Sequence, residues 1–283
     1  MKKLLKSSFL NLHSYPKDNI PAFIRAGLEL FKETGFDVAN SGTNYFLPPD
    51  GKWQPVVEQA LLDAQELNIP FVECHLPFFA ELVDADPAYV EHCNREMYTG
   101  IDIAKALGVE RAVLHANAVP LAHADDRATK FDRMMAYLTP FAEYAAKAGV
   151  NLMVENMRQE LRYCREPEEL CRVADALDFG VCWDFGHANI TGIKQSEALA
   201  YIGKRLKCVH IHDNSGVRDD HLPPFVVRRG NIDWQDAMHG LALAEFEGPL
   251  NYEVVTINIP AEMRKVFAQY LSIAADKLME YIK

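Results

Sequence analysis

Short apolar segments alternate with longer amphipathic ones along the chain, and this alternation limits the fold more than any single motif does. From residue 71 onward the apolar segments are nearly continuous, which is typical of parallel strands that are covered on both faces. We predict strands at residues 4–12, 36–39, 71–75, 111–115, 151–156, 180–184, 207–212 and 250–255. We predict helices at residues 20–34, 55–67, 87–107, 126–148, 166–177, 196–202, 233–243 and 261–282.

Eight strand–helix units in 283 residues predict an α/β fold, a closed (β/α)8 TIM barrel, because such barrels take about 250 residues. We expect one domain over residues 1–283. An open doubly wound sheet is the alternative, but the first predicted strand lacks the glycine-rich turn that binds dinucleotides in that fold. Two long loops, at residues 40–54 and 213–231, are expected to lie over the active face.

The composition argues against membrane and nucleic-acid partners. The net charge of −11 is unfavourable for binding a phosphate backbone, although a local basic patch stays open. No apolar run approaches the roughly 18 residues of a membrane span. The first residues, MKKLLKSSFLNL, are interpreted as a strand rather than a leader, because polar residues interrupt them. The six cysteines form no CxxC pair, so we expect buried free thiols and a cytoplasmic location.

Six successive predicted strands carry a metal-binding residue type near their carboxyl ends. In a barrel these ends meet at one mouth, where the active sites of such enzymes lie. Carboxylates and imidazoles without thiolates suit a borderline divalent ion such as Zn²⁺, Mn²⁺, Co²⁺ or Fe²⁺. In chain order the residues are His75, His115, Glu155, Asp184 with His187, His210 with His212, and Glu253.

Taken singly, several of these residues have a simpler explanation. A lone histidine after an apolar strand is more often a core or capping group, and Asp184 alone can cap the next helix. Glu155 and Glu253 differ, because each lies among apolar residues of a predicted strand and a buried unpaired carboxylate is costly. The coincidence over six strands favours a metal site.

The two long loops add further candidates. Asp219 and His221 form an Asp-x-His pair that can hold a metal, with a surface turn as the alternative. Arginines in the same loop can bind a phosphate or carboxylate, or can be solvated loop charges; they are Arg218, Arg228 and Arg229. Aromatic residues in the first loop can form an apolar wall or lid over a small ligand; they are Tyr45, Phe46 and Trp53.

These motifs resemble those of the xylose-isomerase-like TIM-barrel superfamily, which includes sugar (phosphate) isomerases and epimerases and also the apurinic endonucleases. The resemblance runs from about the third predicted strand to the last. It is carried by HLPF with His75, LMVEN with Glu155, DFGH with Asp184 and His187, HIHDN with His210, the Asp219-x-His221 loop with RGNIDW, and NYEV with Glu253.

For an isomerase or epimerase, the resemblance implies one divalent ion, Zn, Mn or Co, held by Glu155, Asp184, His210 and Glu253. It further implies that the two glutamates flank a small sugar and move protons through a cis-enediolate. A metal-assisted dehydration begins with the same proton abstraction. The resemblance places His187 where relatives bind the substrate. The other substrate-binding candidates are His75, Trp53 and Arg218.

The endonuclease branch implies up to three zinc ions. This chain has a candidate at every ligand position of that cluster, because His75, His115, His187, Asp219 and His221 join the other four residues. The acidic balance favours the isomerase, and a multi-zinc phosphodiesterase or apurinic-site endonuclease is the alternative. A non-catalytic sugar or metal sensor is disfavoured by the intact glutamate pair. Relatives often pair through their barrel helices, so a homo-oligomer is an open expectation.

Overall fold

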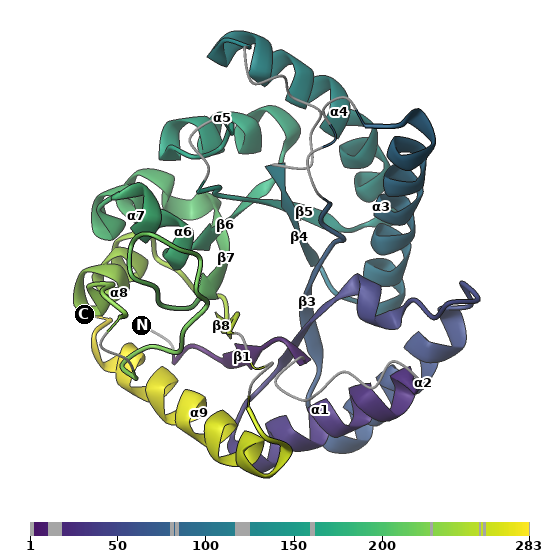
Figure 1. Cartoon of the computed structure of the whole chain (residues 1–283), viewed down its shortest axis with the longest axis vertical. Coiled ribbons are helices and arrows are strands. Elements are labelled where there is room, and N and C mark those ends of the chain that lie inside the picture. The colour runs from purple at the N-terminus through teal and green to yellow at the C-terminus, as the bar shows by residue number, and fades with distance from the viewer. Residues whose placement is uncertain are drawn as a thin grey trace.

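The computed structural model describes residues 3–10, 19–79, 82, 85–116, 125–158, 162–226, 229–254, 256 and 259–282. Within these residues, eight strands form one parallel sheet in the order β1-β8-β7-β6-β5-β4-β3-β2. Figure 1 looks down the resulting barrel. The strands are β1 (Lys6–Ser8), β2 (Ala39–Gly42), β3 (Phe71–His75), β4 (Arg111–His115), β5 (Asn151–Glu155), β6 (Gly180–Asp184), β7 (Leu206–Ile211) and β8 (Leu250–Tyr252).

The two outermost strands of that order, β1 and β2, lie side by side and nearly close the barrel. Phe9 and Asn40 form an isolated parallel bridge just beyond β1. The backbone amides of Asp37 and Val38 both donate to the carbonyl of Lys6. The sheet is therefore a (β/α)8 TIM barrel, as the alternation predicts, and closure leaves little free strand edge.

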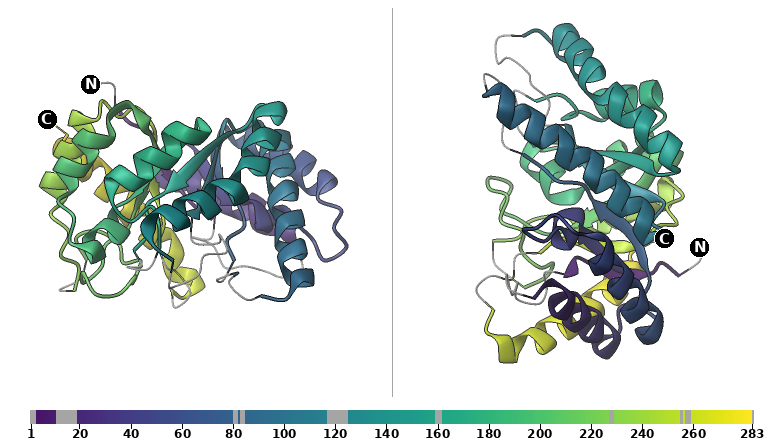
Figure 2. Two further views of the ribbon diagram at one scale, coloured as in Figure 1. Left: turned by 90° about the horizontal axis from the view of Figure 1, so that it is seen from above. Right: turned by 90° about the vertical axis from the view of Figure 1, so that its right-hand side faces the viewer.

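The helices form a ring around the strands (Figures 1 and 2). Each buries an apolar stripe against the sheet, as α5 does with Leu170, Val173 and Ala174. The ring contains α1 (Ile20–Thr34), α2 (Gln54–Leu67), α3 (Pro87–Leu107), α4 (Arg127–Ala148), α5 (Pro167–Leu177), α7 (Gln195–Ile202), α8 (Trp234–Leu243) and α9 (Arg264–Glu280).

Local signals in the sequence fix where several helices begin and end. The side chains of Asp86 and Asp126 accept hydrogen bonds from first-turn amides of α3 and α4. Each of these helices ends at a glycine in the left-handed conformation, Gly108 with φ +71° and Gly149 with φ +79°. These capping residues explain why the first and last residues of α3 and α4 lie within one residue of the predicted positions.

The structure adds one helix to those predicted and shifts the bounds of several elements; β1 begins at Lys6 rather than at residue 4, and α9 begins at Arg264 rather than at residue 261. A short helix, α6 (Phe185–Thr191), follows β6 directly, so strands and helices do not alternate strictly. It is too short for an apolar repeat to reveal. Strand β2 begins at residue 39 rather than 36, and the 3-10 helix η2 (Thr43–Phe46) lies within the predicted loop. Residues 11 and 12 of the first predicted strand and residue 255 of the last lie outside the described residues.

Two expectations from composition can be compared with the structure. All six cysteines are buried and free of disulfide bonds, as expected. Among the described residues, no helix combines the length and apolarity that crossing a membrane requires.

Candidate metal centre

The carboxyl ends of the strands bring the predicted polar residues together at one mouth of the barrel. His115 lies opposite Glu155 in the β4–β5 register, and Asp184 lies opposite His210 in the β6–β7 register. Glu253 follows β8, and its amide donates to the carbonyl of Ile211 on β7. The side chains of Asp184 and His210 are completely buried. Strand register, rather than sequence proximity, therefore assembles the cluster.

Glu155 is the centre of this cluster. Its Oε2 lies 3.1 Å from Nε2 of His115 and 3.4 Å from both Nε2 of His75 and Nδ1 of His210. Its Oε1 lies 3.3 Å from Nδ1 of His187. One buried carboxylate thus faces four imidazoles from four different elements.

Potential ligand atoms fall into three groups, within each of which all atoms lie within 4.8 Å of one another. Glu155 belongs to two of them, so its carboxylate would contribute a ligand atom to an ion in either group. A further combination includes Cys182, but burial raises the pKa of that thiol, which makes it a poor ligand. The three groups are His75 with His115 and Glu155; Glu155 with Asp184, His210 and Glu253; and His212 with Asp219 and His221.

Three of the imidazoles are held in the way that metal-binding histidines are held. Nδ1 of His75 donates to the carbonyl of Leu76 at 2.6 Å, and Nδ1 of His187 donates to the carbonyl of Asn156 at 2.8 Å. Nδ1 of His221 donates to the carbonyl of Glu253 at 2.8 Å. A carbonyl can only accept, so the neutral form of each imidazole carries its proton on Nδ1, and Nε2 is then the nitrogen that can bind a metal.

Buried polar atoms at the centre test whether a metal fits. Among the described residues, several have no hydrogen-bond partner, including Oε1 of Glu155 and both ring nitrogens of His210. Each such atom costs about 1–3 kcal/mol when nothing satisfies it. Because they are carboxylate and imidazole atoms that converge on one volume, a divalent cation fits them.

Without a cation, the carboxylates and imidazoles neutralise one another. Burial alone would raise the pKa of Glu155, but the charges of His210 and His115 hold it well below its usual range. Burial alone would lower the pKa of His221, but its hydrogen bond to Asp219 and the charge of Glu253 raise it to about 9. A bound metal ion would replace such protons, since imidazole binds metals only when neutral.

Asn156 fixes the geometry of the strand end that carries Asp184. Its Oδ1 accepts from the backbone amide of Asp184 at 2.6 Å, and its Nδ2 donates to the carbonyl of Asp184 at 3.0 Å. Asp184 in turn accepts from the amide of His187 at 2.6 Å and caps α6. The capping explanation of Asp184 is therefore correct, and the same carboxylate also belongs to a group of atoms that could hold a metal ion.

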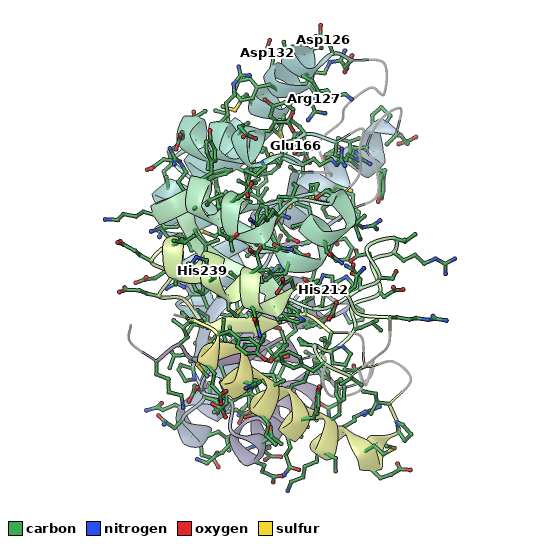
Figure 3. The ribbon with its side chains drawn as sticks, turned by 90° about the vertical axis from the view of Figure 1, so that its left-hand side faces the viewer. Asp126, Arg127, Asp132, Glu166, His212 and His239 are labelled. Atoms are coloured by element: carbon green, nitrogen blue, oxygen red, sulfur yellow. The ribbon has the colours of Figure 1, made fainter. Side chains whose placement is uncertain are left out.

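His212 is a member of the candidate centre. The strand-end pattern includes it beside His210, but neither ligand set implied by the resemblance does. It is fully buried, and its Nε2 lies 3.0 Å from both carboxylate oxygens of Asp184. Its ring stacks on that of His221 at 4.0 Å. The His-x-His spacing was the available signal, because alternate residues of a strand face the same side. Figure 3 labels both residues: His212 lies toward the loops, whereas His239 lies on the outer helix α8, away from the candidate centre.

A cavity of about 170 Å³ opens over the centre. Three of its lining residues were not predicted as site residues, Phe78, Met157 and Arg158. The ring of Phe78 is 66% exposed and stacks on His115 at 5.2 Å. Nε of Arg158 donates to Oδ2 of Asp219 at 3.0 Å. The full lining is Phe78, His115, Glu155, Met157, Arg158, His187, Asp219, His221 and Glu253.

Some predicted substrate-binding residues do not line this cavity. Trp53 precedes α2 and packs against the apolar core, and Phe46 is buried against Phe71. Arg218 is exposed in the loop after β7. His75 is buried beside Glu155 rather than in the cavity wall. Arg228 lies outside the described residues.

Known proteins share both the sequence pattern and the fold. A family model described as xylose isomerase-like TIM barrel matches residues 28–270. The uncharacterised protein MJ1311 of Methanocaldococcus jannaschii is 27% identical over 277 residues, covering 92% of this chain and 89% of that protein.

Two solved structures illustrate the shared fold. An L-ribulose 3-epimerase has a TM-score of 0.76 at 16% identity, covering 99% of this chain and 95% of its own. A D-allulose 3-epimerase from Methylomonas sp., in complex with D-allulose, has a TM-score of 0.73 at 18% identity, covering 100% and 98%. Likeness at these identities shows the fold, whereas the family model matches most of the chain. The chain therefore belongs to the xylose isomerase-like TIM barrel family.

Proposed function

We propose that the protein is a divalent-metal-dependent isomerase or epimerase of a small sugar or sugar-like polyol. The observation that carries this proposal is the position of Glu155 and Glu253. Both belong to one ligand group with Asp184 and His210, and both line the cavity. The structural likeness to sugar 3-epimerases supports the same assignment.

The two glutamates supply the proton transfers of such a reaction. A divalent ion held by the four-residue group would polarise a carbonyl and acidify the carbon beside it. One glutamate, as the carboxylate, would remove the proton from that carbon and leave an enediolate, and the other glutamate, as the carboxylic acid, would return a proton to the opposite face. This sequence inverts the carbon, whereas return of a proton to the neighbouring carbon isomerises the sugar.

The cavity restricts the substrate to a small molecule. Its volume of about 170 Å³ corresponds to roughly six water molecules of liquid volume. Phe78 provides one apolar wall, and the remaining lining is predominantly polar or charged. A sugar of a few carbons matches this combination, because its hydroxyl groups need polar partners while its ring or chain carbons pack on an apolar face.

The proposal is tested with a panel of ketoses and aldoses in the presence of Mn²⁺, Co²⁺ or Zn²⁺. We expect metal-stimulated turnover and incorporation of solvent deuterium at the carbon beside the carbonyl. Glu155→Gln and Glu253→Gln should each lower the rate by at least about 100-fold, the usual size of a general acid–base contribution. Glu91→Gln, on the exposed surface of α3, is the matched control. Absence of both turnover and deuterium exchange would overturn the proposal.

A second function is favoured by the shared position of Glu155 in two ligand groups, with a third group nearby. Two or three zinc ions in these groups would suit phosphodiester hydrolysis, including cleavage at abasic sites in DNA, because paired ions can activate water and stabilise the leaving oxygen. The net charge of −11 is unfavourable for binding DNA. Elemental analysis separates the two functions: one ion per chain favours the isomerase, and three with nicking of abasic DNA favour the hydrolase.

A further inference from the structure

Arg158 gives the cavity a chemical preference that the glutamate pair does not. It lies three residues after Glu155, beyond the end of β5, and its side chain lines the cavity. It is the one lysine or arginine among the described residues that line this cavity. Its side chain is 38% exposed, so a ligand in the cavity can reach the guanidinium group.

One hydrogen bond orients Arg158 without using its outer donors. Nε donates to Oδ2 of Asp219 at 3.0 Å. Asp219 is itself fixed, because its oxygens lie 3.3 Å from Nε2 of His187 and 3.3 Å from Nε2 of His221. The bond to Asp219 involves neither of the two terminal nitrogens of the guanidinium. That planar pair is the arrangement that binds phosphate or carboxylate oxygens through parallel hydrogen bonds.

The net charge of the centre determines whether an anion is attracted from a distance or is bound only by direct contact with Arg158. Four carboxylates, from Glu155, Asp184, Asp219 and Glu253, face the centre. With Arg158, one divalent ion and every histidine neutral, their net charge is about −1, and a second ion changes it to about +1. A single-ion centre whose histidines are neutral therefore does not attract anions by its overall charge. An anion is bound there only through direct contact with Arg158 and the ion.

We propose that Arg158 is an anion-binding residue of the cavity and that the substrate carries a phosphate or carboxylate group. This inference rests on the proposed function for the sugar part of the substrate. The shared chemistry is an oxyanion that accepts two hydrogen bonds from the terminal nitrogens of Arg158. A sugar phosphate and a sugar acid both provide it, whereas a neutral sugar does not.

Calorimetric titration of the metal-loaded protein tests the inference without requiring turnover. The probes are inorganic phosphate, D-ribulose 5-phosphate against D-ribulose, and D-glucuronate against D-glucose. We expect at least one anionic sugar to bind at least tenfold more tightly than its neutral counterpart. A difference in the ribulose pair indicates a phosphate group on the substrate, and a difference in the glucose pair indicates a carboxylate group. Equal or weaker binding of both anionic sugars would overturn the inference.

Substitutions at Arg158 assign the preference to this residue. Arg158→Gln should weaken binding of the preferred anion by at least about tenfold and leave the neutral sugar unchanged, with Arg158→Lys intermediate because it keeps the charge without the planar pair. Arg95→Gln, on the exposed face of α3, is the control. Metal content and melting temperature are measured for every variant. If Arg158→Gln misfolds or loses metal, Arg158→Lys decides the question, and unaltered discrimination in it contradicts the inference.

The outcomes for the anion site and for the isomerase are distinguishable. If anion binding is selective and depends on Arg158, but no sugar exchanges deuterium, the result supports the anion site and contradicts the isomerase. If neutral sugars turn over and Arg158→Gln does not alter the binding of any anion, the result supports the isomerase and contradicts the anion site.

Discussion

The ring of His212 occupies the space that a β-carbon on Gly186 would need. Gly186 lies in the first turn of α6, and His212 follows the end of β7. The absent side chain lets α6 approach β7 closely enough for His212 to reach the carboxylate of Asp184. The DFGH and HIHD motifs are therefore two halves of one packing arrangement at the metal centre.

Gly186→Ala should destabilise the protein, although alanine favours helices more than glycine does. The added methyl group meets a buried, rigid ring that is held by Asp184, and such overpacking costs about 1–3 kcal/mol. Urea unfolding of the metal-free protein measures this change. The three atoms nearest to the added carbon all belong to His212, so Gly186→Ala should cost much less in a His212→Ala background. Additive effects in the double mutant would contradict the packing explanation.

Metal binding at neutral pH should release protons. The pKa of His221 is raised to about 9, and the charges of neighbouring groups also raise the pKa values of His187 and His210 despite their burial. These shifts favour the protonated imidazoles in the metal-free protein, and a metal ion binds only their neutral form. Affinity should therefore rise as pH increases toward 9. Calorimetry at pH 7.5 in buffers of different ionisation enthalpy measures the protons released, and an absence of release contradicts this protonation pattern.

Substitutions in separate ligand groups should distinguish one ion from several. His210 belongs to the four-residue group with both glutamates, whereas His115 belongs to the group with His75. For a single-ion isomerase, His210→Ala should abolish metal binding and His115→Ala should leave the metal content unchanged. Elemental analysis of the purified variants measures both. Loss of one ion from several in His115→Ala would instead favour the multi-zinc hydrolase.

The candidate ligands at the strand ends were predictable because apolar strands are regular in sequence and the barrel that they form is regular in space. Apolar strands in a barrel end at a common mouth, so the sequence alone places Glu155, Asp184 and His210 near one another. The short helix α6 was not predictable, because seven residues give no apolar repeat. His212 was visible as half of a His-x-His pair, but which of two inward-facing imidazoles contacts an ion depends on strand register and on the space left by Gly186.

Loop side chains were less predictable than strand ends, because a loop sequence does not specify the direction of each side chain. Trp53 and Phe46 have the aromatic character expected of a substrate wall, yet both pack toward the core. Arg218 and Arg158 carry the same charge, but of the two only Arg158 lines the cavity, since it lies three residues beyond the end of β5 and Asp219 holds it there. Proximity to a strand end was thus a better guide than residue type.

Phe78 and Phe46 should respond oppositely to truncation. The ring of Phe78 is 66% exposed at the cavity, whereas Phe46 is completely buried. Phe78→Ala should change the free energy of unfolding by less than about 0.5 kcal/mol, as surface substitutions usually do, while raising KM several-fold by removing an apolar contact with the substrate. Phe46→Ala should cost about 3–5 kcal/mol through the cavity it leaves. Urea unfolding and steady-state kinetics on the best substrate of the panel measure these effects, and an unchanged KM in Phe78→Ala would remove this residue from the substrate site.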